Sequence, residues 1–427
     1  MIGHSFAELL GTLVALLVST KVLGVAAQRF GQPSIVGELV AGVLLGGSVL
    51  GILDPADPVL HALAELGVLI LLFEIGLHTN LRSLTKVGRE ATTVALVGVA
   101  LPFGFGYAAA TILGLGTIPA IVSGAALTAT SIGISARTLS DLGKLDTPEG
   151  QIVLGAAVLD DIVGLIILSV VSGIVGGAAF SIAGVATTTA VAMGFVVAAL
   201  VLGPVLVPPM FRAIGRIEAS GTLGVAGLAF AFLLAFLADL AGSATIIGAF
   251  SAGLLLNDTP QRATIEKATT HLGHFFVPIF FAMVGAAVEL RTLADARAIA
   301  IGLTLVAAGV VGKVLAGYAP FWFKGDKALI GVAMVPRGEV GLIFASMGLA
   351  TGALTSDLYS AIAMMVLATT FITPPFLAQM IKSRTRHASG APADQPGDGG
   401  IDDLVAGAAT GQHAVTAPVR PPSAAGP

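Results

Sequence analysis

The chain contains no cysteine among its 427 residues, and only 11% of them are charged. Without cysteine there is no disulfide framework, no thiol chemistry and no cysteine metal site. The seven histidines lack an HExxH-type spacing, and the sequence contains no P-loop and no G-x-S-x-G string. We therefore predict a protein that is not an enzyme and that needs no cofactor.

Apolar residues dominate instead: 56% of the chain is hydrophobic and the mean hydropathy is +0.96. That exceeds what a soluble core can hide and predicts an all-α, polytopic membrane protein. The first apolar stretch begins almost at the N-terminus without a basic region or an A-x-A site, so we interpret it as a true span. Stretches of spanning length fall at roughly 5–27, 34–52, 59–78, 91–114, 117–139, 150–175, 182–207, 220–241, 243–256, 271–289, 296–321, 327–350 and 355–381.

The distribution of positive charge decides between twelve and thirteen spans. The ninth stretch is short and nearly continuous with the eighth, so a twelve-span count is open. With thirteen spans, 17 of the 21 lysines and arginines fall on one side, two on the other and two inside spans. The positive-inside rule then predicts thirteen spans, an external N-terminus and a cytoplasmic C-terminus. The tail, residues 383–427, is rich in Gly, Pro, Ala and Asp, and we predict that it is disordered and cytoplasmic.

Two interruptions suggest internal symmetry. Span 5 is interrupted at residues 128–133 and span 12 at residues 336–338. They lie seven spans apart, an odd offset, so the corresponding units would have opposite orientations in the membrane. We predict an inverted repeat of spans 1–6 and 8–13, with span 7 as linker and two crossing discontinuous helices. Such paired interruptions point to a transporter's binding site.

Asp160 and Asp161 lie side by side in an apolar run that carries no other charge. A carboxylate at the centre of a membrane helix costs about 2.5–3.5 kcal/mol on insertion scales. Helical neighbours differ by about 100°, so one acid can face a cavity while the other faces a partner helix. An ion or proton pathway is the favoured interpretation. The alternative is a structural ion pair that locks the bundle.

Lys313 is the only charge in the stretch 298–318 and is the natural counter-ion for one of the two aspartates. Helical phase alone leaves open which aspartate it contacts. The alternative is a lysine that extends to the cytoplasmic interface near Trp322.

The interruptions themselves carry further candidates. Thr128, Thr130 and Ser131 offer hydroxyls that suit Na⁺ or Li⁺ beside a carboxylate, although back-bonding within a kinked helix would explain them too. In span 12 we expect Arg337 to end the first half-helix and Glu339 to begin the second, where their charges offset the half-helix dipoles. A direct role of these two in ion binding is the alternative. Glu38, Glu65 and Glu74 are expected to pair at a helix or subunit interface.

Several strings, taken together, resemble the bacterial monovalent cation/proton antiporters, including their Kef-like membrane domains, over about residues 5–382. The paired aspartate makes the chain most similar to NapA-type Na⁺/H⁺ antiporters. The strings are 32–38 (QPSIVGE), 65–76 (ELGVLILLFEIG), 130–137 (TSIGISAR), 158–161 (VLDD), 276–281 (FVPIFF) and 336–341 (PRGEVG).

The resemblance implies a homodimer in which residues 1–382 form the antiporter membrane domain. Its panel would comprise spans 1–3 and 8–10, and its mobile core spans 4–6 and 11–13. By position, Asp161 would be the ion-binding carboxylate and Asp160 the switchable salt-bridge partner of Lys313. A paired aspartate also implies electrogenic exchange, with more protons than sodium ions moved.

We therefore predict a secondary active Na⁺(Li⁺)/H⁺ antiporter of the bacterial inner membrane that serves pH homeostasis. Na⁺ and H⁺ would compete for Asp161, assisted by Asp160, Thr130 and Ser131, during elevator-type alternating access. Its partners are the monovalent cation, protons, the lipid bilayer and a second copy, not nucleic acid. A K⁺/H⁺ antiporter or K⁺ efflux system of the same fold is the alternative. An intramembrane aspartyl protease is disfavoured because its Gly-x-Gly-Asp string is absent.

Overall fold

The computed structural model describes residues 6–175, 182–217, 219, 221–288 and 296–388, and over these residues the fold is all-helical. No strand occurs in this described part, where the only β-type contact is an isolated bridge between Gly46 and Leu53. Nine helices within these ranges are long and apolar enough to cross a membrane. They are α1 (Phe6–Arg29), α3 (Pro58–His78), α5 (Gly88–Ile112), α8 (Pro148–Val175), α9 (Ile182–Ile214), α10 (Thr222–Leu240), α12 (Arg262–Ala286), α13 (Ala296–Tyr318) and α16 (Ser356–Ala388).

Shorter helices account for the remaining predicted spans. The second and ninth correspond to α2 (Ser34–Leu45) and α11 (Thr245–Asn257). The fifth is divided into α6 (Thr117–Ala126) and α7 (Ile132–Asp141), and the twelfth into α14 (Lys327–Ala333) and α15 (Glu339–Ala350). Each predicted apolar stretch therefore contains helix, and both predicted interruptions are present.

Two boundaries differ from the sequence-based expectation. The second stretch was expected to run to residue 52, but α2 ends at Leu45 because Gly46 adopts extended backbone (φ −65°, ψ 172°). The chain then turns through Gly51, whose φ of 65° favours glycine. A short helix that was not predicted, α4 (Leu81–Lys86), follows α3; Asn80 caps it by accepting hydrogen bonds from the backbone N–H groups of Arg82 and Ser83.

The C-terminal segment also departs from its expected boundary. Disorder was expected from residue 383, whereas α16 continues to Ala388. The rest of the predicted disordered tail, 389–427, lies outside the described residues.

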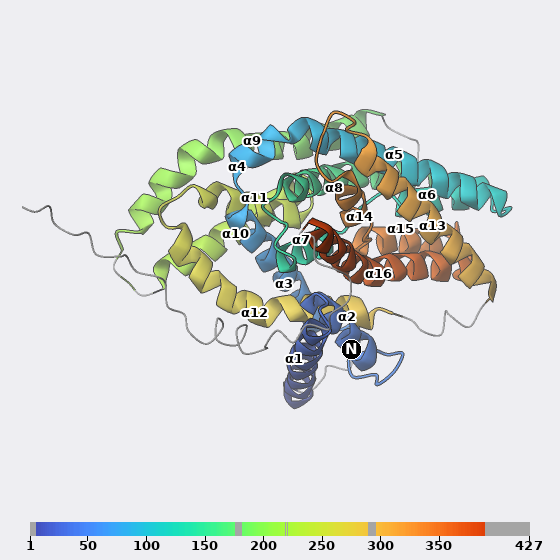
Figure 1. Cartoon of the computed structure of the whole chain (residues 1–427), viewed down its shortest axis with the longest axis horizontal. Coiled ribbons are helices and arrows are strands. Elements are labelled where there is room, and N and C mark those ends of the chain that lie inside the picture. Colours follow the sequence, from blue (N-terminus) through green and yellow to red (C-terminus); the bar gives the residue numbers. More distant parts are fainter. Residues whose placement is uncertain (1–5, 176–181, 218, 220, 289–295, 389–427) are drawn as a thin grey trace, which may run out of the picture. The chain divides into compact units, whose positions relative to one another are not determined.

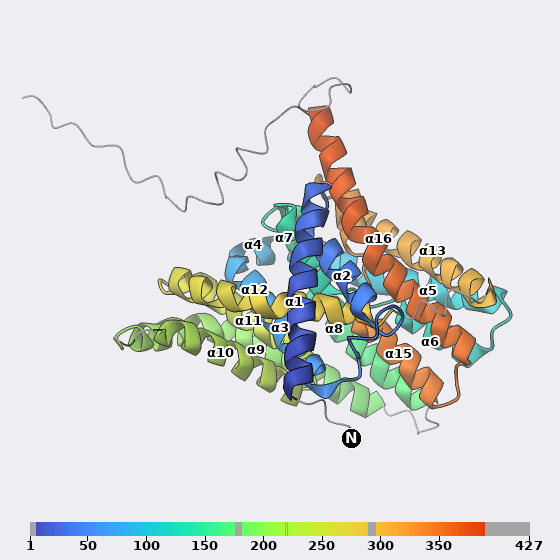
Figure 2. The same ribbon diagram turned by 90° about the horizontal axis from the view of Figure 1, so that it is seen from below.

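The helices form two groups by their contacts. In the first group, α3 packs against α11 and α12, α2 packs against α1 and α12, and α10 packs against α11. In the second, α5 packs against α6, α8 and α13, while α14 packs against α13 and α15 packs against α6. In Figure 1 the helices α10–α12 lie on the left, and α5, α6, α13 and α15 lie on the right. Figure 2 shows α1 running past α12 beside α2.

Glycine permits the close packing of the first group. A Cβ on Gly37 would collide with the backbone of Leu23 in α1, and one on Gly42 with the backbone of Ala282 in α12. Between α3 and α11, a Cβ on Gly253 would meet the backbone of Phe73. Small residues at helix crossings allow backbones to approach, which is how membrane helices gain packing energy where lipid is as apolar as the helix itself.

The two groups meet at a shared apolar core around α3, α7, α8, α11 and α12. Buried residues from both groups belong to one cluster, among them Leu72, Ile132, Ile162, Phe250 and Phe281. This core includes residues next to the segments that separate α6 from α7 and α14 from α15, such as Ile132 and Met334.

Candidate ion-binding site

Two non-helical linkers lie next to each other inside the protein: residues 127–131, between α6 and α7, and residues 334–338, between α14 and α15. Pro336 lacks an N–H group, and the adjoining residues leave helical geometry, with Gly338 at φ −127° and ψ −153°. The Ser131 N–H donates to the Pro336 carbonyl at 2.9 Å, which joins the linkers backbone to backbone. A backbone group that one interruption leaves without a helical hydrogen bond thus finds its partner in the other interruption.

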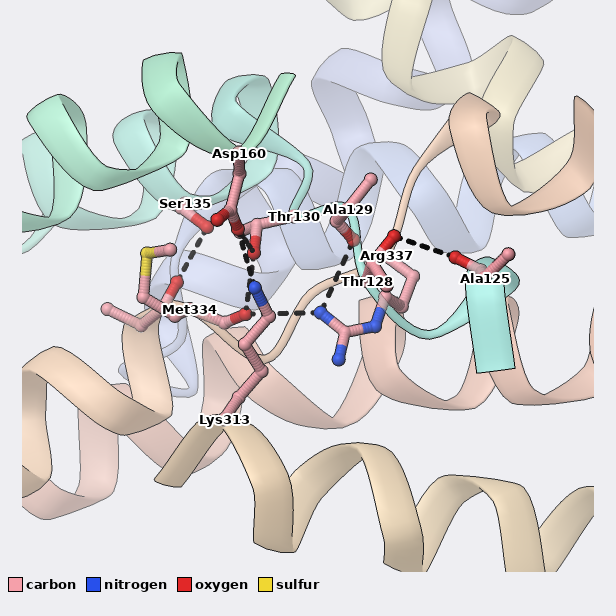
Figure 3. Close-up of polar contacts among 10 residues, drawn as sticks. Ala125, Thr128, Ala129, Thr130, Ser135, Asp160, Lys313, Met334 and Arg337 are labelled. Atoms are coloured by element: carbon pink, nitrogen blue, oxygen red, sulfur yellow. Dashed lines mark hydrogen bonds and ion pairs between the residues drawn. The ribbon is translucent and has the colours of Figure 1, made fainter. Parts of the chain in front are cut away.

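Side-chain hydroxyl groups also form hydrogen bonds between the first interruption and the C-terminal end of α14. Thr130 Oγ1 donates to the Met334 carbonyl at 3.1 Å, and Ser135 Oγ donates to the Ala333 carbonyl at 2.7 Å. Both carbonyls are at the C-terminal end of a helix, where intrahelical partners run out. Thr128 does show the back-bonding that the sequence left open, since its hydroxyl donates to the Ala125 carbonyl at 2.7 Å. Thr130 instead bonds across to other elements (Figure 3).

Asp160 of α8 and Lys313 of α13 form an ion pair at 2.5 Å. Both side chains are fully buried, so Lys313 does not extend to the interface. Thr130 Oγ1 lies 2.8 Å from the same carboxylate oxygen, Asp160 Oδ2, so its single hydroxyl proton is shared between this carboxylate and the Met334 carbonyl. Gly98 of α5 leaves room for the lysine, because a Cβ there would lie 3.3 Å from Lys313 Nζ. Of the two contacts that helical phase allows, the structure contains the one with Asp160.

Asp161 faces a different environment. It is 5% exposed and lines a small cavity, together with Thr130 and Ser131. Val68 of α3, Ile246 of α11 and Phe280 of α12 line the cavity from the first helix group. The linkers, α7, α8 and α15 supply the other wall: Ala129, Thr130, Ser131, Ile132, Gly133, Asp161, Gly338 and Val340. Asp161 therefore faces the boundary between the helix groups, whereas Asp160 is paired inside the second group.

Arg337 is fully buried in the linker before α15. Its Nη1 donates to the Ala129 carbonyl at 3.3 Å and to the Met334 carbonyl at 3.4 Å. The expectation that Arg337 ends the first half-helix was wrong, because α14 stops at Ala333, before the chain reaches Pro336. The guanidinium nevertheless lies beside carbonyls that follow the C-terminal ends of α6 and α14, where a cation offsets the helix dipoles.

The second charge predicted to offset a half-helix dipole is that of Glu339. Its backbone begins α15, but its side chain lies outside the described part of the structure.

Two residues that hold the site in shape were not identified from the sequence. Gly98 lies in an apolar run with no local signal, and only the approach of Lys313 explains it. Thr370 Oγ1 of α16 donates to the Arg337 carbonyl at 2.6 Å and so connects the second linker to α16. An isolated threonine in an apolar helix usually bonds within its own helix, so its sequence context gave no indication of this contact.

The four buried charges of the site balance. Asp160 and Asp161 carry two negative charges, and Lys313 and Arg337 carry two positive charges when all four are ionised. A monovalent cation beside Asp161 would add one positive charge to a buried site. At about 4 Å and an effective dielectric constant of about 20, each such interaction amounts to about 4 kcal/mol. An additional cation would therefore unbalance these charges unless another positive charge left the site.

Comparison with known proteins shows the family and the fold. A family model described as "Sodium/hydrogen exchanger, transmembrane" matches residues 12–382. The High-affinity Na(+)/H(+) antiporter NhaS3 of Synechocystis is 39% identical, over 89% of this chain and 91% of that protein. The Na(+)/H(+)-K(+) antiporter GerN of Bacillus cereus is 34% identical, over 86% and 94% respectively. The fold matches the sodium proton antiporter MjNhaP1 of Methanocaldococcus jannaschii with a TM-score of 0.71, at 18% identity, over 92% of this chain and all of that one.

Proposed function

The chain belongs to the sodium/hydrogen exchanger family, whose members are transporters and not enzymes, and from this premise we propose that it exchanges Na⁺ or Li⁺ for protons at Asp161. The observation that carries the proposal is the position of Asp161. It is a nearly buried carboxylate that lines a cavity between two helix groups, beside two interrupted helices. Carboxylate, hydroxyl and backbone oxygens are ligands that suit hard monovalent cations.

Competition at Asp161 is the core of the mechanism. The carboxylate binds either a cation or a proton, and each expels the other because the surrounding charges already balance. Thr130 and Ser131 line the same cavity and complete the oxygen environment of a bound ion. Proton-motive force would then drive Na⁺ out of the cell and serve pH homeostasis.

Asp160 and Lys313 form a second, switchable element. Cation binding at Asp161 weakens the pair between them, and Asp160 can then turn toward the ion. A proton released from Lys313 makes the exchange electrogenic, because more positive charge moves with the protons than with the cation. The 2.5 Å ion pair, with Thr130 in contact with both Asp160 and the second linker, supports a connection between the pair and the cavity.

Alternating access would be of the elevator type. Spans 1–3 and 8–10 form a panel and spans 4–6 and 11–13 a mobile core. The division of helix contacts supports this, since α1–α3 pack with α10–α12, while α5, α6 and α8 pack with α13–α15. A cavity lined from both sides is where a sliding core would carry its ion past the panel. We propose a homodimer, with the panel providing the fixed part.

Thirteen crossings and an inverted repeat complete the proposal. The nine long helices, together with α2, α11 and the two divided spans, supply the segments for thirteen crossings. The adjacent linkers in spans 5 and 12 support a repeat of spans 1–6 and 8–13. We place the N-terminus outside and the C-terminus in the cytoplasm, from the charge distribution.

A K⁺/H⁺ antiporter is the second candidate, and one specific observation favours it. A relative that is 34% identical over 86% of this chain carries K(+) in its name besides Na(+). Both activities use the same competition, so the identity of the cation has to be measured.

The test uses the full chain reconstituted in proteoliposomes with an imposed pH gradient and a pH-sensitive dye. Addition of Na⁺ or Li⁺ is expected to dissipate the gradient, and Asp161→Asn is expected to abolish the response. A response to K⁺ alone would assign the second candidate. No response to any of the three cations would refute antiport.

A further inference from the structure

A second cavity lies among α1, α2, α7 and α12, and none of the residues discussed for the ion site lines it. Its wall combines two cations, a carboxylate and a histidine with apolar and small residues. The lining residues are Leu17, Thr20, Lys21, Glu38, Arg137, Gly273, His274 and Pro278. It is thus a polar cavity, which buried Glu38 shares with the exposed Lys21 and His274.

Glu38 is the unusual member of this cavity. The residue is 6% exposed, and its Oε2 atom is buried with no hydrogen-bond partner among the described residues. A buried carboxylate oxygen without a partner is costly, by about 1–3 kcal/mol for an ordinary polar group and more for a charged one. The sequence led us to expect Glu38 in a helix-interface pair, and the structure instead places it at a cavity.

Charged groups reach Glu38 from each helix packed against α2. Lys21 comes from α1, His274 from α12, and Arg137 and Asp141 from α7. Lys21 and His274 lie on the same helix group as Glu38. Arg137 lies on α7, which packs against α2 and α3 as well as α8 and belongs to span 5 of the proposed core.

Arg137 is held by contacts that cross between the groups. Its Nε pairs with Asp141 Oδ1 at 3.0 Å, one turn along α7. Ser34 at the start of α2 donates to Asp141 Oδ2 at 3.0 Å and accepts from Arg137 Nη2 at 3.3 Å. A displacement of α7 relative to α2 breaks both hydrogen bonds of Ser34 and withdraws the guanidinium from the cavity.

We propose that Glu38 is a second proton-binding site of the transporter, which takes up a proton when the core withdraws Arg137 from the cavity. The inference rests on the proposed movement of a core that contains α7 against a panel that contains α2. With Arg137 present, the ionised carboxylate is compensated by a nearby cation. With Arg137 withdrawn, Lys21 still lines the cavity, but its side chain is exposed and solvent screens its charge, so a proton compensates the buried carboxylate more effectively. Protons would therefore bias the position of the core through a residue that does not touch the transported ion.

The sign of the effect follows from this linkage. Alkaline conditions keep Glu38 ionised and favour the arrangement with Arg137 in the cavity. Acidic conditions favour the displaced arrangement. For one proton, the ratio of the two populations changes by up to about tenfold per pH unit within the responsive window.

The experiment exploits the absence of cysteine, since introduced cysteines are then the only labelling sites. Spin labels at Phe30→Cys, just after α1, and Ser140→Cys, on α7, report the distance between the groups; both positions are exposed. Distance distributions of the full chain in lipid nanodiscs are measured from about pH 5 to about pH 9, a range that spans carboxylate and histidine titration. The background carries Asp161→Asn, so that the carrier itself does not titrate.

In that background we expect a pH-dependent change in the distance distribution. Glu38→Gln should remove more than half of its amplitude, and Glu38→Asp should retain it. The matched control is Glu65→Gln on α3, whose side chain is 67% exposed, and it should leave the response intact. A pH response that is absent from the background, or that keeps most of its amplitude in Glu38→Gln, overturns the proposal.

The same labels separate this inference from the proposed function. With Asp161 intact, Na⁺ should also shift the distance distribution. If Na⁺ produces no shift, the core movement is wrong. If Na⁺ shifts it and Glu38→Gln leaves the pH response unchanged, Glu38 alone is wrong. If Glu38→Gln fails to fold, Glu38→Asp provides the test instead. This variant keeps a carboxylate, so loss of the pH response in a folded Glu38→Asp protein would count against the proposal.

Discussion

Replacement of Lys313 by methionine tests how much the buried ion pair contributes to stability. Lys313→Met retains most of the side chain's volume but removes its charge, leaving Asp160 as a fully buried carboxylate. Loss of one partner from a buried pair costs about 3–5 kcal/mol. Thr130 still donates to Asp160 Oδ2 at 2.8 Å, so we expect the lower end of this range, about 3 kcal/mol.

The second charge can be removed to complete the comparison. Asp160→Asn combined with Lys313→Met leaves no uncompensated charge, and replacement of a whole buried pair is often neutral. We therefore expect the double variant to regain most of the lost stability, with a coupling energy of about 2–3 kcal/mol. The cost of Lys313→Met should also grow with pH, because at acidic pH a proton can neutralise the carboxylate that has lost its partner.

The assay is equilibrium unfolding of the purified chain in detergent micelles, with wild type, both single variants and the double variant at two pH values. Lys324→Met provides the control, since Lys324 is exposed and its replacement should stay within about 0.5 kcal/mol of wild type. Two results would refute the reasoning. Either Lys313→Met unfolds like the control, or the double variant loses the sum of the two single losses, which would mean that the pair is not coupled.

Three further variants test the transport chemistry. Lys313→Gln should leave some exchange but abolish its voltage dependence, measured as current on a solid-supported membrane; unchanged electrogenicity would remove Lys313 from a role in supplying a proton. Asp161→Asn should reduce Na⁺-driven proton movement in dye-loaded proteoliposomes to the level of empty vesicles, and residual saturable exchange would place the carrier elsewhere. Gly338→Ala puts a Cβ 3.0 Å from Ser131 Oγ, so we expect a loss of about 1–3 kcal/mol and a higher apparent KM for Na⁺. Gly47→Ala, which would have open space, should match wild type in both measurements.

The interruptions of spans 5 and 12 could be predicted because their causes are local. Pro336 lacks an N–H group wherever it lies, and a run of hydroxyl residues competes with helical bonding in any surroundings. The extent of each linker could not be predicted. Residues 127–131 and 334–338 are stabilised by contacts between the linkers, such as the bond from the Ser131 N–H to the Pro336 carbonyl. A linker of this kind is fixed by its partner and not by its own sequence.

The contact between Asp160 and Lys313 could likewise be predicted only in part. A lone lysine and adjacent aspartates in apolar helices predict that some buried pair forms, since an uncompensated charge would be too costly. The choice of aspartate depends on the rotation of α8, which is set by packing of α8 against α5, α6 and α14. The role of Gly98 could not be predicted either, because it depends on where Lys313 lies. The rotation of a helix and the close approach of two helices depend on tertiary packing, which the hydropathy of the sequence does not reveal.

Arg337 connects these observations. The sequence suggested a charge that offsets one half-helix dipole, and the guanidinium instead reaches carbonyls that follow both α6 and α14. Its Nε and Nη2 atoms, and Asp160 Oδ1, have no hydrogen-bond partner among the described residues. The centre therefore contains a cation with spare donors close to an acid with a spare acceptor. Because arginine stays protonated, Arg337 would keep the linkers together during the proposed loss of a proton from Lys313. In this proposal Arg337 is a permanent cation that stabilises the linkers, and Lys313 is a second cation whose charge changes during transport.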